Sequence, residues 1–202
     1  ISFAPHTDDA RAKWLDYDTR HMLTELDPKP DCVTITTGTT LWDVTQAFIP
    51  GDADGTHLAD PKVAAAWADM VVDSTSSFYI EHLKRLSKNK IQPYFVPGHV
   101  HQLEIIERLL RAGVYKGPLN VALCGYGGGS MGRNPFDWME MLRRTPHGAS
   151  SVTFWSSMRG NIAIQTLATI LGCHVRVGIE DNIWDMHKNR WPTVKQVEWA
   201  VK

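Results

Sequence analysis

Apolar positions along the chain follow two periods that alternate with each other. Short β-branched or apolar runs, typical of buried strands, are separated by longer stretches in which apolar residues recur every three to four positions, as on one face of a helix. Six runs read as strands and cover residues 31–38, 69–73, 92–98, 120–127, 151–157 and 174–181. The clearest helical stretches cover residues 76–89, 101–113, 134–144 and 161–172. This alternation predicts an α/β protein built from βα units around a parallel sheet.

The predicted strands begin roughly 20 to 40 residues apart, a spacing that suits βα units. Two closures fit the repeat: an open doubly wound sheet, or a (β/α)₈ TIM barrel that lacks its first two βα units. In either fold, ligands bind at the carboxyl ends of the strands. With no linker or low-complexity tract in between, residues 1–202 are expected to form a single domain, covering roughly the third to eighth strands of the barrel.

Composition narrows the class of protein. The chain has 202 residues, 43% of them hydrophobic, and a formal net charge of -1, so it is typical of a globular domain and indicates neither a nucleic-acid nor a membrane-surface partner. It lacks an apolar run of roughly 20 residues and a secretion signal, so we expect a cytoplasmic protein. Its three cysteines have no C-x-x-C spacing and are expected to be buried free thiols.

The chain starts without an initiator Met and stops inside a helical pattern. We therefore expect an incomplete copy of a longer protein, without the first two βα units and the C-terminal end. An incomplete barrel would have two open sheet edges, which other strands or a partner must cover. We expect a homo-oligomer for this reason.

The string "HVRVGIED" at residues 174–181 ends an apolar run in two carboxylates. Side chains on a strand alternate between faces, so Arg176 and Glu180 are expected on the inner face of a barrel, with Glu180 at its mouth. An ion pair that only holds the strand is the structural alternative. Burying charge is costly, and a core does not require it, so the pattern favours a functional site. A metal ligand beside a general base would explain both acids.

Three other motifs leave alternatives open. "TITTGTT" at residues 34–40 ends a strand in hydroxyls that can bind a ligand, although Thr is also a common strand residue. His99 and His101 follow a strand and can bind a metal with Glu180 as third ligand, or one of them can cap a helix. "GYGGGSMG" at residues 125–132 matches G-x-G-x-x-G, but the next strand has no acid for a ribose. It reads as a glycine loop approaching a phosphate or thioester, or as a tight turn.

In these motifs the chain resembles the β-keto acid cleavage enzymes, the family of 3-keto-5-aminohexanoate cleavage enzyme. The resemblance rests on the string at residues 174–182, on the Thr-Thr-Gly at residues 36–38, on Gly98 with His99, on the glycine loop, and on the tail "TVKQVEWAVK". It runs in order from about Pro30 onward.

The resemblance implies a TIM barrel that holds a divalent zinc and condenses a β-keto acid with acetyl-CoA to give acetoacetate and a new acyl-CoA. By the same resemblance, Glu180 is a metal ligand, Asp181 is the catalytic base and Arg176 lies in the catalytic site. The implied substrate-binding residues are Thr36, Thr37, Gly38 and His99.

The chain departs from the family pattern in two places. The family's other two zinc ligands form an H-x-H motif ahead of the Thr-Thr-Gly strand, and no such motif precedes Thr36 here. His6 is the only histidine near the expected distance upstream. The strand at residues 92–98 also lacks the family's glutamate. Two alternatives therefore stay open: another divalent-metal TIM-barrel lyase or hydrolase that uses no coenzyme A, and a catalytically silent binding chain.

Overall fold

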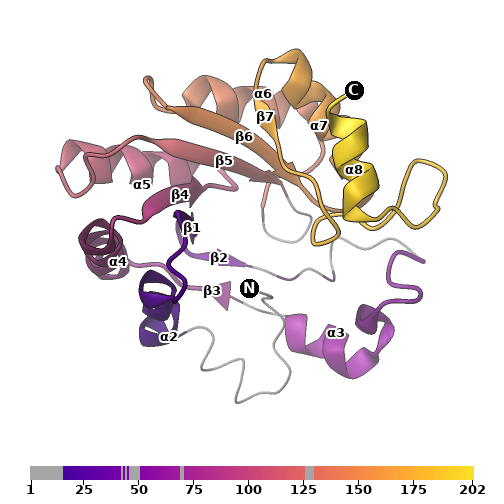
Figure 1. Cartoon of the computed structure of the whole chain (residues 1–202), viewed down its shortest axis with the longest axis horizontal. Coiled ribbons are helices and arrows are strands. Elements are labelled where there is room, and N and C mark those ends of the chain that lie inside the picture. Colours follow the sequence, from indigo (N-terminus) through magenta and orange to yellow (C-terminus); the bar gives the residue numbers. More distant parts are fainter. Residues whose placement is uncertain (1–15, 42, 44, 46–50, 69–70, 126–129) are drawn as a thin grey trace.

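A five-stranded parallel sheet forms the centre of the protein (Figure 1). The computed structural model describes residues 16–41, 43, 45, 51–68, 71–125 and 130–202. Its strands, in spatial order, are β1 (Cys32–Thr36), β4 (Gln92–Val96), β5 (Asn120–Gly125), β6 (Ser151–Ser156) and β7 (His174–Val175). Two further strands, β2 (Thr40–Leu41) and β3 (Val71–Val72), form a separate antiparallel pair.

Helices begin where the sequence supplies caps. Thr75 accepts a hydrogen bond from the Phe78 amide at the start of α4 (Ser76–Asn89), and Asn134 accepts one from the Phe136 amide at the start of α6 (Pro135–Arg144). The remaining helices are α2 (Tyr17–His21), α3 (Pro61–Trp67), α5 (Val100–Arg111), α7 (Asn161–Ile170) and α8 (Thr193–Ala200). Three 3₁₀ helices complete the described elements: η1 (Met22–Glu25), η3 (His57–Ala59) and η4 (Met158–Gly160).

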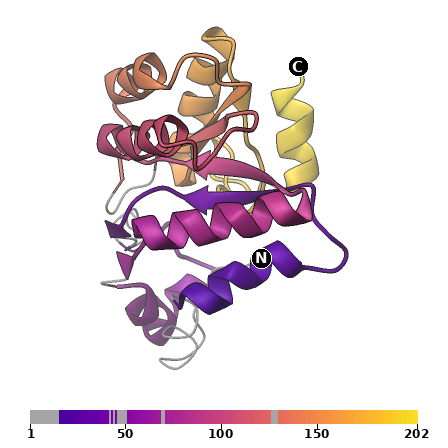
Figure 2. The same cartoon turned by 90° about the vertical axis from the view of Figure 1, so that its left-hand side faces the viewer.

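The two faces of the sheet differ in what covers them. Helices α4, α5, α6 and α7 lie along one face of the sheet (Figure 1 and Figure 2). Their side chains pack with alternate strand residues, such as Phe95, Leu123 and Phe154, in one large core. Residues on the opposite face, including Cys124 and Trp155, form a second, smaller cluster. The strand order also runs one way along the sheet. A doubly wound sheet would reverse its order and carry helices on both faces, so this winding argues against that alternative.

Four of the six predicted strands are confirmed as members of the sheet with nearly the expected bounds: β1, β4, β5 and β6. Residues 69–73 were expected to form a strand of the parallel sheet, and this prediction is wrong. The strand β3 instead pairs antiparallel with β2 in a separate sheet. Within the described residues the sheet is open, with β1 and β7 as its edges.

None of the helices in the described ranges has the length and apolar character needed to cross a membrane.

The prediction for residues 174–181 is wrong beyond the first residues. The last ladder bond runs from the Arg176 amide to the Phe154 carbonyl, and Gly178 then adopts a φ of 150°. A residue with a side chain rarely adopts this conformation, so the glycine allows the chain to leave the sheet. The alternation of side chains expected for a strand therefore stops, and Asp181, not Glu180, turns inward.

The cysteines are free, as predicted, but only Cys124 is buried. Cys173 is partly exposed and Cys32 is exposed at the start of β1. The expectation of three buried thiols is therefore wrong for Cys32 and Cys173, which lie in or beside the edge strands β1 and β7, because an edge strand is less well covered than the centre of the sheet.

A buried histidine pair joins α2 to α4. The Nδ1 atoms of His21 and His82 lie 2.9 Å apart, and both rings stack on Phe78 with centroids at 5.0 Å. Burial lowers the pKa of His82 to about 4 and also lowers that of His21. The charged groups that act on the pair are Asp18 and Arg20 on the α2 side and Glu81 and Arg85 on α4. Both rings are therefore neutral in the folded protein near pH 7.

Because His21 and His82 are buried as neutral rings, we expect the protein to lose stability as the pH falls below about 6.5. An unfolded histidine binds its proton near pH 6.5, whereas folded His82 does so near pH 4, so the unfolded state binds more protons between these values. The free energy of unfolding should fall by roughly 2–3 kcal/mol as the pH drops through this window. Urea unfolding of His82→Leu should show a flatter pH dependence, while His147→Leu at an exposed position should match the unmodified chain. Parallel curves for all three proteins would contradict the prediction.

Candidate active site

The loop that follows β7 brings Asp181 back to the sheet. The Asp181 and Asn182 amides both donate to the Gly178 carbonyl at 3.1 Å, and the Asp181 carbonyl accepts from the Met158 amide at 2.7 Å. These bonds close a tight turn just beyond the carboxyl end of β6. The Asp181 side chain consequently points toward the face of the sheet that carries Trp155 and Cys124.

Gln196 of α8 holds this loop from the other side. It is fully buried; its Oε1 accepts from the Gly178 amide at 2.9 Å, and its Nε2 donates to the carbonyls of Asn182 and Trp191. The Gly178 amide, which would otherwise pair with a neighbouring strand, is thereby satisfied. The tail of the chain therefore fixes the position of the turn, a role that its amphipathic pattern does not reveal.

Asp181 is almost completely enclosed. Its side chain is 1% exposed, and its Oδ1 accepts a hydrogen bond of 2.5 Å from the indole Nε1 of Trp155. Its Oδ2 lies 3.1 Å from Nε of Arg176, at ion-pair distance, but accepts no hydrogen bond within the described residues. One carboxylate oxygen is thus held firmly, while the other has unused acceptor capacity.

Burial raises the pKa of Asp181 to about 7, although Arg176 and the Trp155 hydrogen bond favour the charged form. The neighbouring Cys124 is also buried; its desolvation, together with the Asp181 charge, raises the pKa of its thiol. A carboxyl group that titrates near neutral pH is suited to take up and release a proton in a reaction.

Arg176 connects both acids. Its guanidinium lies 3.9 Å from the centre of the Trp155 ring, pairs with Asp181, and also bonds Oε2 of Glu180 through a terminal nitrogen. The Glu180 side chain is 59% exposed and lies on the solvent side of this pair. The structure therefore brings Arg176, Glu180 and Asp181 together. The strand pattern predicted that Glu180 would point inward, but Asp181 is the buried acid and Glu180 the exposed one.

The Thr-Thr-Gly segment lies at the carboxyl end of β1, as the Asp181 turn lies beyond the carboxyl end of β6. Thr37 is fully buried, and its hydroxyl donates to the Ile35 carbonyl at 3.4 Å. The Gly38 amide donates to the hydroxyl of Tyr79, which itself donates to the Thr36 carbonyl. Of the three predicted substrate-binding residues in this segment, Thr36 is the one that is partly exposed.

Gln102 ties this segment to the end of β4. Its Oε1 accepts from the amides of Gly98 and His99, and its Nε2 donates to the Thr40 hydroxyl at 3.1 Å. His99 precedes α5 as its N-cap residue, and its ring stacks on that of His101 at 5.7 Å. The sequence did not predict a role for Gln102, because a glutamine in an amphipathic helix is expected at the surface. Here its side chain is buried.

The described part of the glycine loop has a packing role. A Cβ atom on Gly125 would lie 2.1 Å from Cζ2 of Trp138, so the strand end needs a glycine to approach that ring. Trp138 also donates from Nε1 to the Gly132 carbonyl at 3.0 Å. The predicted phosphate or thioester contacts fall mainly on residues 126–129, outside the described residues.

No group of three or more His, Cys, Asp or Glu among the described residues is arranged to hold a metal ion. The alternative in which His99, His101 and Glu180 share a metal is therefore wrong. Glu180 is present but bonded to Arg176, and His6 lies outside the described residues. The described residues alone do not fit a zinc site.

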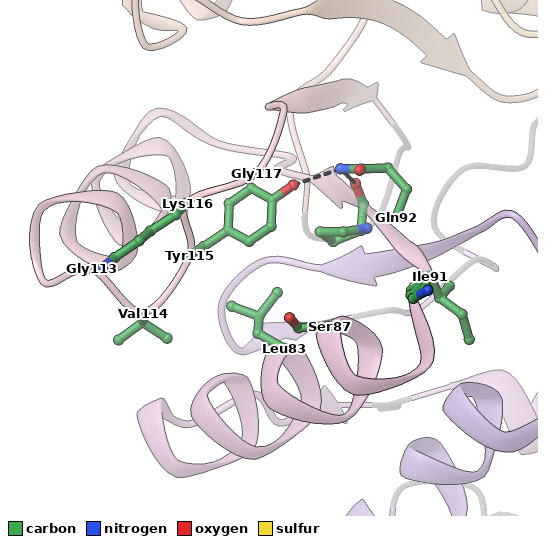
Figure 3. Close-up of a pocket in the computed structure, with 11 residues that line it drawn as sticks. Leu83, Ser87, Ile91, Gln92, Gly113, Val114, Tyr115, Lys116 and Gly117 are labelled. Carbon is green, nitrogen blue, oxygen red and sulfur yellow. Dashed lines mark hydrogen bonds between the residues drawn. The ribbon is translucent and has the colours of Figure 1, made fainter.

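A cavity of about 420 Å³ lies away from this site (Figure 3). It is bounded by the end of α4, the start of β4 and the segment after α5, where Tyr115 and Gln92 are joined by a 2.5 Å hydrogen bond. The cavity lies at the amino end of β4, whereas the Asp181 cluster lies at the carboxyl ends of the strands. The two are therefore separate sites.

Comparison with known proteins adds an independent observation. The sequence model described as beta-keto acid cleavage enzyme matches residues 6–202. A curated protein, 3-keto-5-aminohexanoate cleavage enzyme of Acetoanaerobium sticklandii, is 26% identical over 116 residues. That similarity covers 57% of this chain and 42% of the relative, so the chain matches less than half of the relative's length.

Proposed function

Because this chain belongs to the β-keto acid cleavage enzyme family, we propose that the cluster of Trp155, Arg176 and Asp181 is where it cleaves a carbon–carbon bond of a β-keto acid. The observation that carries the proposal is the buried Asp181 carboxylate. Its Oδ2 faces a cation yet accepts no hydrogen bond within the described residues. An oxygen with that free capacity can accept a proton from a substrate carbon or hydroxyl.

The proposed reaction transfers the acyl part of the β-keto acid to coenzyme A. The bond between the keto carbon and the adjacent CH₂ group breaks, and the acetyl group of acetyl-CoA joins the CH₂–carboxylate fragment to form acetoacetate. The acyl group and the coenzyme A thiol together form the new acyl-CoA. Asp181 would take up and return the proton moved during these steps, and Arg176 would hold negative charge next to it.

Substrate binding is proposed at the carboxyl ends of β1 and β4, in the same sheet. Thr36 is partly exposed, while Thr37 and Gly38 shape the segment from within. His99 would approach the substrate from the start of α5. We also propose that further strands, from the same chain or a second copy, complete a TIM barrel along β1 and β7, because parallel sheets are rarely left with uncovered edges.

Glu180 remains a proposed zinc ligand, with its partners outside the described residues. In binding a metal it would exchange the Arg176 contact for the ion. Metal analysis of the full-length protein should find about one zinc per chain, and Glu180→Gln should lower that content at least tenfold at limiting zinc. Glu198→Gln, which removes an exposed carboxylate bonded to Lys195, is the matched control. Equal zinc contents in all three proteins would remove Glu180 from the ligand set.

One assay tests the proposed function against its alternative. Full-length protein with a panel of β-keto acids should form acetoacetate only when acetyl-CoA is added. Consumption of the β-keto acid without acetyl-CoA would instead indicate a lyase or hydrolase that uses no coenzyme A. No turnover under either condition would indicate a binding chain.

A further inference from the structure

Trp155 touches both residues proposed for the chemistry. Its indole N–H donates to Oδ1 of Asp181 at 2.5 Å, and its ring face lies 3.9 Å from the guanidinium carbon of Arg176. The Arg176 Nε in turn lies 3.1 Å from Oδ2 of Asp181. The three side chains therefore form a closed triangle in which each one contacts the other two.

The triangle limits how Asp181 can move. A carboxylate held by one ion pair can still rotate about its terminal bond, because that torsion is broad. A donor fixed on the opposite oxygen removes this freedom and leaves Oδ2 in a defined direction. The ring also limits Arg176, since a guanidinium is attracted to an aromatic face in a flat arrangement.

The donor itself is rigidly placed. Trp155 lies on β6, paired in register with Cys124 of β5, and is 6% exposed. Arg176, in contrast, makes the last ladder bond of its strand, just past the end of β7, and Asp181 lies in the loop beyond it. A side chain anchored on a central strand positions groups more accurately than a loop can by itself.

Building on the proposed function, we propose that Trp155 is a positioning residue that orients Asp181 through its indole N–H and Arg176 through its ring. Since misplacement of a reacting group by about 1 Å can cost on the order of 100-fold in rate, loss of the N–H should act on kcat. Binding of the substrate at the strand ends should be little affected.

Trp155→Phe keeps an aromatic face for Arg176 and removes the N–H. In the full-length enzyme we expect kcat to fall about 10- to 100-fold with KM within about twofold. The matched control is Trp67→Phe in α3, where a buried indole Nε1 has no hydrogen-bond partner among the described residues. This variant should keep both constants. An unchanged kcat in Trp155→Phe, or a fall that Trp67→Phe reproduces, would overturn the role of Trp155.

A second measurement does not depend on activity or on the folding of Trp155→Phe. In ¹H–¹⁵N NMR spectra, the Trp155 indole proton should resonate downfield of the other indole protons, because it is bonded to a buried carboxylate, and should move upfield in Asp181→Asn. An indole signal that does not respond to Asp181→Asn would overturn the contact. A responsive signal in a full-length protein that cleaves no β-keto acid would overturn the proposed function and, with it, the catalytic purpose of the contact.

Discussion

Replacing Asp181 by Asn should lower kcat for β-keto acid cleavage by about 10²- to 10⁴-fold, the usual contribution of a general acid or base. Asn has nearly the same shape and can still accept the Trp155 N–H through its amide oxygen. It cannot take up a proton from the substrate. Steady-state kinetics of the full-length variant, with acetyl-CoA saturating, would measure the loss.

The control for this experiment separates chemistry from folding. Asp137→Asn makes the same change at an exposed position on α6 and should leave kcat unchanged. Asp181→Asn should remain folded, because the neutral amide avoids the cost of burying a charge. A folded Asp181→Asn enzyme with more than a tenth of the original kcat would exclude Asp181 as the base.

Gly125→Ala should destabilise the protein by about 3 kcal/mol or more. The added methyl group would lie 2.1 Å from Trp138, whose ring is fully buried and stacked on Phe154 at 5.2 Å. Neither the ring nor the strand end can move without disturbing the main core, so the overlap is relieved only by shifting α6 or β5. Urea unfolding of the 202-residue chain would measure the difference.

Gly132→Ala is the matched control, because it lies in the same glycine-rich segment but has no atom within 4 Å of its Cβ position. Its free energy of unfolding should differ by less than about 0.5 kcal/mol from that of the unmodified chain. If the two substitutions had equal effects, the close packing of Gly125 against Trp138 would not determine the spacing between β5 and α6.

Periodicity predicted the elements that form the main core. The strands β1, β4, β5 and β6 and the helix α4 were recoverable because buried faces repeat every two or 3.6 residues, and α4 agrees with its predicted bounds at both ends. The failure at β3 has a physical cause. A Met-Val-Val run between two aspartates satisfies the pattern of any short strand, and periodicity does not determine which strand is its partner.

The candidate site was only partly predictable. Sequence analysis found Arg176, Glu180 and Asp181, but it extended the strand through Gly178 and so assigned the inward position to Glu180. The buried roles of Trp155, Gln102 and Gln196 were not visible, because each depends on hydrogen bonds between residues distant in sequence. A tryptophan on a strand satisfies the core pattern whether or not its N–H binds a carboxylate.

We propose that this chain carries the catalytic carboxylate of an enzyme that moves an acyl group from a β-keto acid to coenzyme A. The most direct measurement incubates full-length protein with an unlabelled β-keto acid and acetyl-CoA labelled with ¹³C in the acetyl group. The account predicts ¹³C in the acetyl half of acetoacetate and an unlabelled new acyl-CoA, both lost in Asp181→Asn. Acetoacetate without label, or labelled product formed equally by Asp181→Asn, would contradict it.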